Sequence, residues 1–234
     1  MNVSQIEPNW GRVQSLDLHC ETYQVAGKAV YTRFFGIRAR AIVEDWVFPK
    51  QVHGQTCIDA LGCVSGVTQA DAISTTSSHT KLAIQTADCV PILVSNGSQN
   101  MALHCGWRGL AAGLIKSALA DFPEKNRALL LIGPHISQES YEVGPELLAP
   151  IRTSLPPDID ISWVWQESAN VGKFLLNLSR VAILQLTAVG FPIDAVRLTN
   201  ECTLCSANGW HSFRRDGKNA GRNWSVISSQ PICG

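Results

Sequence analysis

Runs of apolar residues that end at glycine, proline or polar clusters recur along the chain and predict buried strands. The clearest are KLAIQ (81–85), PILVS (91–95), MALHC (101–105), RALLLI (127–132) and AVRLTN (195–200). Asn96-Gly97 separates the second run from the third and predicts a hairpin between them. Before Phe48 the pattern is poorly periodic, with short strand-like runs such as Gln24 to Val30.

Two segments instead repeat their apolar residues at helical spacing. One helix is expected over 110–122, directly after the MALHC strand, and another over 176–192, where Gly190 and Pro192 provide stop signals. Strands and helices mixed in this order predict an α/β or α+β domain of layered sheets and helices. No repeat or linker marks a boundary, so residues 1–234 are expected to form a single domain.

Composition narrows the class of protein. A chain of 234 residues that is 45% apolar can build one substantial core. Its 19 basic and 19 acidic residues cancel, which argues against nucleic acid as a partner. No stretch approaches the roughly 20 apolar residues of a membrane span, and the N-terminus lacks the pattern of a signal peptide. We therefore expect a cytoplasmic protein with no membrane partner, and we interpret its eight scattered cysteines as reduced thiols.

Three short segments at the ends of apolar runs combine histidine, cysteine and glycine: KQVHG (50–54), TADCVP (86–91) and HCGWRGL (104–110). Their His53, Cys89 and His104 are a zinc-type ligand set, and three protein ligands would leave a fourth position for water or substrate. Cys105 competes with Cys89, but neighbours in a strand point to opposite faces, so only one of His104 and Cys105 should reach the site. The alternative is that both histidines are ordinary hydrogen-bonded residues and Cys89 a buried thiol.

Arginines beside glycine form a second constellation. Arg108 lies in GWRG, and Arg214 and Arg215 lie in SFRRDG, near Arg222. Guanidinium groups next to flexible backbone suit a bound phosphate or carboxylate. The alternative is a surface turn with solvated arginines.

Cys202-Thr203-Leu204-Cys205 is the only C-x-x-C, and a single one is a weak metal or redox signal, so a buried structural role is the default. The chain has no G-x-S-x-G, P-loop, H-E-x-x-H or G-x-G-x-x-G, which removes the commonest serine-hydrolase, NTPase, zincin and Rossmann interpretations. His19-Cys20-Glu21 only distantly echoes the zinc deaminases.

Eight motifs in order resemble the YfiH family, also called the laccase-domain or multicopper polyphenol oxidase family. They are KQVHG, QADA, TADCVPIL, HCGWRG, IGPHI, YEVG, ECT and SFRRDGKNAGR, spread from about Phe48 to Val226. The resemblance implies zinc on His53, Cys89 and His104 and a layered α/β fold similar to cytotoxic necrotizing factor-type hydrolases. Residues 1–47 diverge from the family pattern, with only Ser15-Leu16-Asp17 of its usual motifs.

The resemblance further implies a purine nucleoside phosphorylase acting on adenosine, inosine and methylthioadenosine, with adenosine deaminase activity, whose partners are purine nucleosides and phosphate. Phosphorolysis needs an anion cradle, for which Arg108, Arg214 and Arg215 are candidates. Deamination needs a water activated by zinc. Further candidates are Gln51 and His135 as substrate contacts, and Asp88 as a general base or as the residue that orients a metal-bound histidine.

Three alternatives use the same residues. A multicopper oxidase needs about ten histidines, several in H-x-H pairs, whereas this chain has six and no such pair, so copper is disfavoured. A cysteine hydrolase would use Cys89 as nucleophile and His104 or His53 as its base, and would suit a peptidoglycan editing factor. A non-catalytic binding protein would close the metal site with a fourth ligand: Cys105, His135 or Cys202.

For the oligomeric state, a monomer is favoured.

Overall fold

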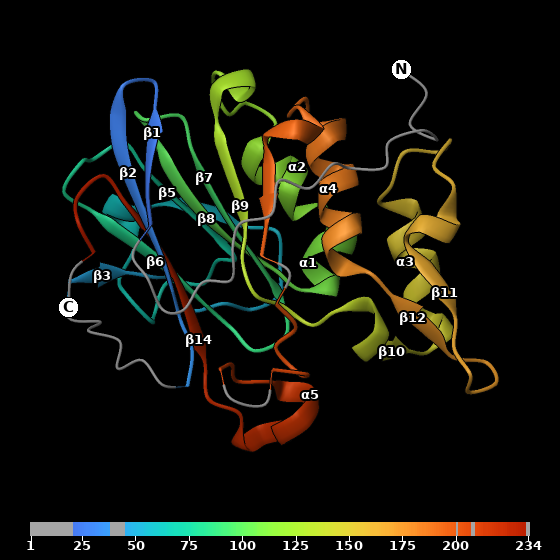
Figure 1. Cartoon of the computed structure of the whole chain (residues 1–234). Coiled ribbons are helices and arrows are strands. Elements are labelled where there is room, and N and C mark those ends of the chain that lie inside the picture. The colour runs from blue at the N-terminus through green and yellow to red at the C-terminus, as the bar shows by residue number, and fades with distance from the viewer. Residues whose placement is uncertain (1–20, 38–44, 200, 207–208, 233–234) are drawn as a thin grey trace.

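The computed structural model describes residues 21–37, 45–199, 201–206 and 209–232. Its strands form two large sheets and one small one (Figure 1). The five-stranded sheet has the order β1 (Glu21–Val25), β2 (Lys28–Phe35), β14 (Asn223–Ser228), β6 (Lys81–Thr86), β3 (Trp46–Val47). The six-stranded sheet has the order β13 (Val196–Leu198), β9 (Leu129–Ile132), β7 (Val90–Ser95), β8 (Asn100–Cys105), β5 (Ala72–Thr75), β4 (Cys57–Asp59).

The small sheet and all but the last of the α-helices lie on one side of the two large sheets (Figure 1). The order in the small sheet is β10 (Glu142–Val143), β12 (Phe174–Leu176), β11 (Trp165–Glu167). The α-helices are α1 (Trp107–Ala112), α2 (Leu114–Leu119), α3 (Leu148–Thr153), α4 (Leu178–Ala188) and α5 (Phe213–Asp216). Short 3-10 turns cover Ala60–Gly62, Lys125–Arg127, Gln138–Ser140, Pro145–Leu147, Ile161–Trp163, Ile193–Ala195 and Gly217–Asn219. The layered mixture confirms the predicted fold class.

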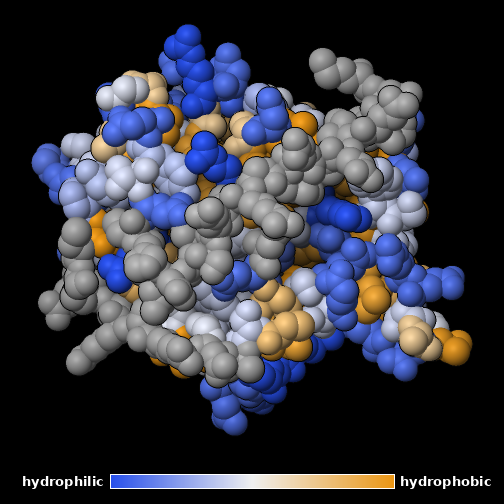
Figure 2. Space-filling view, viewed as in Figure 1, coloured by the Kyte–Doolittle hydropathy of each residue, from blue (hydrophilic) through white to orange (hydrophobic). Residues whose placement is uncertain are grey.

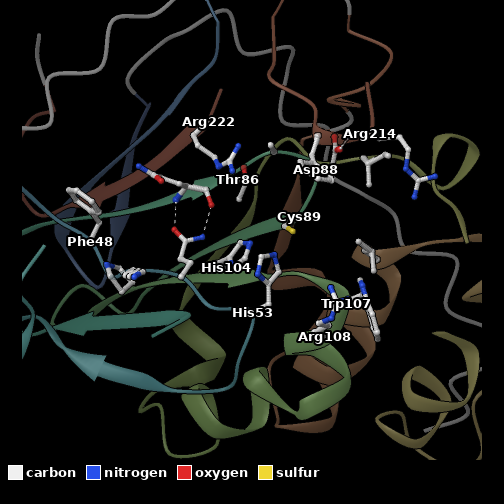
Figure 3. A pocket seen from close by; sticks show the side chains of 18 of the residues that line it. Phe48, His53, Thr86, Asp88, Cys89, His104, Trp107, Arg108, Arg214 and Arg222 are labelled. Atoms are coloured by element: carbon white, nitrogen blue, oxygen red, sulfur yellow. Dashed lines mark hydrogen bonds between the residues drawn. The ribbon is translucent and has the colours of Figure 1, made fainter. Parts of the chain in front are cut away.

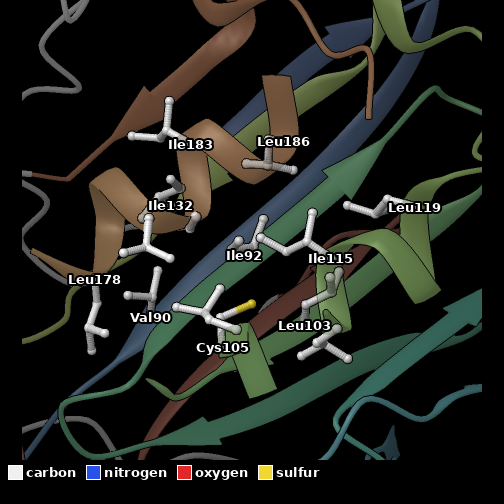
Figure 4. Close-up of a cluster of buried hydrophobic side chains, with 14 of the residues drawn as sticks. Val90, Ile92, Leu103, Cys105, Ile115, Leu119, Ile132, Leu178, Ile183 and Leu186 are labelled. Carbon is white, nitrogen blue, oxygen red and sulfur yellow. The ribbon is translucent and has the colours of Figure 1, made fainter. Parts of the chain in front are cut away.

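The six-stranded sheet is buried on both faces, because the five-stranded sheet covers one and the helices cover the other. In β7, Val90, Ile92 and Val94 pack in the helix-side core, whereas Leu93 packs against the five-stranded sheet. This explains why β7 is apolar at nearly every position instead of alternating. The helix-side core also contains residues of α2 and α4 (Figure 4).

The hairpin predicted at Asn96-Gly97 is confirmed, since β7 and β8 pair in antiparallel register from Val90↔Cys105 to Ser95↔Asn100. The strands predicted over 81–85, 127–132 and 195–200 form β6, β9 and β13, although residue 200 lies outside the described residues. The prediction of a single strand-like run from Gln24 to Val30 is wrong. This run contains the turn Ala26-Gly27, where both φ angles are positive, and so belongs to the β1–β2 hairpin.

The helix expected over 110–122 is broken. Gly113 adopts φ 86°, which ends α1 and begins α2. The apolar stripe is nonetheless buried, because Leu110, Leu114 and Leu119 are fully covered. The helix expected over 176–192 is confirmed as α4, and Gly190 follows it with φ 97°. Within the described ranges, no helix combines the length and the hydrophobicity needed to cross a bilayer.

Candidate metal centre

The candidate site lies where the chain passes from one large sheet to the other. β6 belongs to the five-stranded sheet and β7 to the six-stranded sheet, and the turn between them carries Asp88 and Cys89. Asp88 has φ 87°, a conformation that non-glycine residues adopt at a cost. The reversal places the Cys89 sulfur beside His53 and His104 (Figure 3).

His104 is the second-last residue of β8. Cys105 next to it is fully buried in the helix-side core, so the two side chains point to opposite faces, as strand alternation predicts. Burial raises the pKa of the Cys105 thiol well above its ordinary value, as do the charges of Cys89 and Asp71. Cys105 is therefore an inert core thiol in this structure.

The KQVHG loop is fastened to β6 by Gln51. Its Nε2 donates to the Gln85 carbonyl at 2.6 Å, and its Oε1 accepts from the Gln85 amide at 2.7 Å. These bonds imitate a strand pairing and fix the loop beside the TADC turn. His53, two residues on, has φ 60° and is exposed. The structure thus places Gln51 in the pocket wall, with its amide used to position the loop.

Asp71 is the residue that sequence reasoning missed. Its buried carboxylate accepts the backbone N–H groups of Val52, His53 and Gly54 at 3.3, 2.9 and 2.6 Å, and it pairs with Nδ1 of His104 at 2.8 Å. Burial would raise the pKa of Asp71, but the bonds from His104 and Gly54 lower it below its ordinary value. The aspartate of the QADA motif was the available signal.

These contacts bring His53, Cys89 and His104 together. One potential ligand atom from each lies within 4.8 Å of the others. The two imidazole rings are 4.8 Å apart at 77°. Because Asp71 occupies Nδ1 of His104, Nε2 is the nitrogen left for a metal. A Cβ on Gly106 would lie 3.1 Å from the Cys89 sulfur, so only glycine leaves the cluster its full space.

The cluster favours a thiolate. Burial would raise the pKa of Cys89, but the charge of His104 and hydrogen bonds from His104 and His53 lower it to about 6. Burial would lower the pKa of His104, but Cys89 and Asp71 raise it to about 9. A thiolate and two imidazoles suit a borderline-soft divalent metal. The donor set therefore fits a metal ion.

A pocket of about 650 Å³ opens over the cluster. Its lining includes the three cluster residues, the cations Lys50, Arg108, Arg214 and Arg222, and the aromatic side chains Phe48, Trp107, Tyr141 and Phe213. Thr86 also lines it, and although this residue is only 2% exposed, its hydroxyl has no hydrogen-bond partner among the described residues. The pocket thus offers cations, aromatic faces and a free hydroxyl around the candidate metal.

Asp88 fixes the part of the pocket wall that contains Arg214. One carboxylate oxygen accepts the hydroxyl of Thr203 at 2.7 Å, and the other accepts the backbone N–H of Arg214 at 2.7 Å. Among the described residues this carboxylate makes no hydrogen bond to a histidine, and Asp71 is the residue that orients His104. The general-base role of Asp88 stays a prediction.

The candidate arginines separate into two groups. Arg108 lies 4.5 Å over the Trp107 ring, Arg214 lies 5.0 Å over the Tyr141 ring, and both line the pocket. Arg215 does not line it. Its guanidinium pairs with Asp216 and donates to backbone carbonyls, including that of Trp210 at 3.0 Å. The Arg215 side chain therefore joins its own helix to the backbone of the preceding segment.

The residues considered as a fourth ligand are not part of the cluster. Among the described residues, the metal-competent group contains three members, without Cys105, His135 or Cys202. His135 is buried outside the pocket lining, with Nδ1 2.8 Å from the Gly133 carbonyl oxygen, and burial lowers its pKa. Its role as a substrate contact stays a prediction.

Fold and site together define a layered α/β protein with an open His-Cys-His cluster in a cationic, aromatic pocket at the end of a β-sandwich. Residues 15–230 match the family model described as "Multi-copper polyphenol oxidoreductase laccase". The chain belongs to this family, the YfiH family.

Named relatives and solved structures agree with this assignment. The chain is 31% identical over 184 residues to "Purine nucleoside phosphorylase YfiH" of Shigella flexneri, covering 77% of this chain and 72% of that protein. YlmD from Geobacillus stearothermophilus superposes with a TM-score of 0.73 at 27% identity, over 81% of this chain and 75% of that one. Protein NMB0706 of Neisseria meningitidis gives a TM-score of 0.75 at 25% identity, over 89% and 98%.

Replacing Asp71 tests its role in orienting the cluster. We expect Asp71→Asn to weaken zinc binding by about 10–100-fold, because His104 loses its anionic partner and the backbone N–H groups of the His53 loop lose a carboxylate oxygen as acceptor. Competition with a chromogenic chelator measures the affinity. Glu167→Gln, an exposed charge loss on β11, is the matched control. Equal affinities in Asp71→Asn and the unmodified protein would contradict this role.

The lowered thiol pKa predicts a pH profile for alkylation. In metal-stripped protein, the rate of Cys89 alkylation by iodoacetamide should rise with pH and reach half its maximum near pH 6, because the thiolate is the reactive form. In His104→Gln the midpoint should move up toward an ordinary thiol value of about 8.5. Peptide mass spectrometry measures the rate, with His79→Gln as control. A midpoint already near 8.5 in the unmodified protein would show that no such ion pair forms.

Proposed function

We propose that this chain is a zinc-dependent purine nucleoside phosphorylase, acting on adenosine, inosine and methylthioadenosine, that also deaminates adenosine. The observation that carries the proposal is one pocket lined both by the three-member metal cluster and by Arg108 and Arg214. The name of the Shigella relative, purine nucleoside phosphorylase, supports the same activity. Zinc is proposed over copper because six histidines without H-x-H pairs cannot supply a multicopper centre.

The arginines suit the phosphate. In Figure 3, Arg214 lies above and Arg108 below, both on the side of the cluster away from Phe48. One N–H group of Arg214 donates to the Glu142 carbonyl at 2.7 Å, and the remaining guanidinium N–H groups of both residues suit an anion. The Trp107 and Tyr141 rings beneath them limit where these side chains can move. Phosphate held there is oriented for attack on the ribose carbon of a nucleoside bound across the cluster.

The opposite side suits the purine. Phe48 lies there in Figure 3, and its ring packs edge-on against Trp224 at 5.0 Å. An aromatic side chain offers a surface for a base. The buried Thr86 hydroxyl, which has no hydrogen-bond partner among the described residues, belongs to a residue of the same pocket lining. Arg222 also lines the pocket, and one nitrogen of its guanidinium donates to the Ala220 and Gly221 carbonyls at 2.9 Å each.

In the proposed reaction, a phosphate oxygen forms a bond to the ribose carbon while the bond from that carbon to the purine nitrogen breaks. The purine leaves with the electron pair and takes up a proton, and the product is ribose 1-phosphate. When bound to His53, Cys89 and His104, zinc would supply Lewis acidity to the pocket. The chain's own residues bind the phosphate, orient the nucleoside and keep Cys89 as a thiolate.

A cysteine hydrolase is the second candidate, and one observation favours it. The arrangement resembles a catalytic triad: His104, as the base, contacts the nucleophile Cys89, and the Asp71 carboxylate orients His104. The lowered pKa of Cys89 and raised pKa of His104 suit a thiolate–imidazolium pair. Such an enzyme would work without metal and would suit editing of peptidoglycan precursors.

Turnover and metal content together test the proposal. Zinc-loaded protein should release free base from inosine and adenosine in the presence of phosphate, and ammonia from adenosine. Cys89→Ala should lose the zinc and at least about 100-fold of the base release, the scale of a lost electrostatic stabiliser. Cys63→Ala, a thiol outside the pocket lining, is the matched control.

Two results would contradict the phosphorylase. Base release that is independent of phosphate would indicate hydrolysis. Metal-stripped protein that keeps a Cys89-dependent activity on muropeptide substrates, with no base release in either metal state, would establish the cysteine hydrolase instead.

A further inference from the structure

The C-x-x-C segment lies beside the pocket without taking part in the metal cluster. Cys202 forms an isolated β-bridge with His135, and its thiol is half-buried, whereas Cys205 is exposed. Neither cysteine lines the pocket. The proposed reaction therefore gives this pair no role.

The two sulfur atoms share one hydroxyl group. The Ser140 Oγ lies 3.0 Å from the Cys205 sulfur and 3.5 Å from the Cys202 sulfur. The Cys202 sulfur also accepts the backbone N–H groups of Ser137 and Cys205, each at 3.4 Å. Amide donors aimed at a sulfur stabilise its thiolate form. Burial would raise the pKa of Cys202, but hydrogen bonds from the side chains of Ser137 and Ser140 and from the two backbone amides lower it to about 7.

Thr203 connects the pair to the pocket wall. It stands between the two cysteines, and its hydroxyl donates to Asp88. The other Asp88 oxygen accepts the backbone N–H of Arg214, whose side chain lines the pocket. Two hydrogen bonds of 2.7 Å each therefore link the segment from Cys202 to Cys205 with the backbone of Arg214.

We propose that Cys202 and Cys205 form a redox-sensitive dithiol, which a hydroperoxide converts to an intramolecular disulfide that loosens the hold of Asp88 on Arg214. The Cys202 thiolate attacks the peroxide, whose O–O bond breaks to leave a sulfenic acid and an alkoxide or hydroxide. The Cys205 thiol then attacks the Cys202 sulfur, the disulfide forms, and water leaves. A dithiol reductant reverses the reaction by thiol–disulfide exchange.

Closing the disulfide must disturb this segment. Both sulfurs would turn from Ser140 toward each other, and the Cys202 sulfur would no longer be a thiolate for the Ser137 and Cys205 amides. A metal is the alternative partner for two thiols, but the metal-competent group found among the described residues lies elsewhere, at His53, Cys89 and His104. Redox chemistry is therefore the use that this pair's surroundings favour.

Peptide mapping tests the disulfide. The full chain, loaded with zinc to protect Cys89, is treated with hydrogen peroxide, and free thiols are alkylated. We expect the peptide that contains both cysteines to lose two hydrogens and to regain them with dithiothreitol. In Cys205→Ser the same treatment should leave a sulfenic acid on Cys202 that dimedone traps, and Cys63→Ser should behave like the unmodified protein. Free, alkylatable Cys202 and Cys205 after treatment would overturn the proposal.

Hydrogen–deuterium exchange tests the coupling without relying on any substrate. The amide of Arg214 should exchange at least several-fold faster in the oxidised protein than in the reduced protein, because its acceptor has shifted. Cys205→Ser should show no such change after peroxide. An Arg214 amide with the same exchange rate in both redox states would overturn the link to the pocket, even if the proposed phosphorylase activity were established.

Discussion

A single buried carboxylate, that of Asp71, holds the candidate metal centre together. It gathers three successive amides of the His53 loop and the Nδ1 of His104, so two of the three cluster residues depend on its position. A buried charge is costly unless it is fully paired, and removing one partner of such a group commonly costs about 3–5 kcal/mol. The amides and the imidazole satisfy the carboxylate here. The site is thus part of what stabilises this end of the sandwich.

A second aspartate plays the corresponding part on the other wall of the pocket. Asp88 joins the TADC turn to Thr203 and to the backbone of Arg214, which brings segments far apart in sequence around one cavity. Both His53 and Asp88 have positive φ angles, and both are held by hydrogen bonds at or beside the strained residue. Backbone strain concentrated at a site indicates that the network, more than local preference, sets the geometry there.

The sequence predicted the parts of this arrangement that depend on local pattern. Apolar runs located β6, β7, β8 and β9, and strand alternation correctly separated His104 from Cys105. The broken helix at Gly113 was missed because the apolar stripe continues across it. Asp71 was missed because one aspartate between alanines carries no periodicity, and its partners come from two other segments. The sequence could not predict that Arg214 lines the pocket and Arg215 does not, because this difference depends on tertiary contacts.

The central claim is that His53, Cys89 and His104 form one open metal site, and zinc X-ray absorption spectroscopy tests it most directly. The account predicts one sulfur ligand at about 2.3 Å and two imidazole nitrogens at about 2.0–2.1 Å, with a light atom completing the shell and the sulfur lost in Cys89→Ala. A shell without sulfur, or one closed by a second sulfur or a third imidazole, would contradict it.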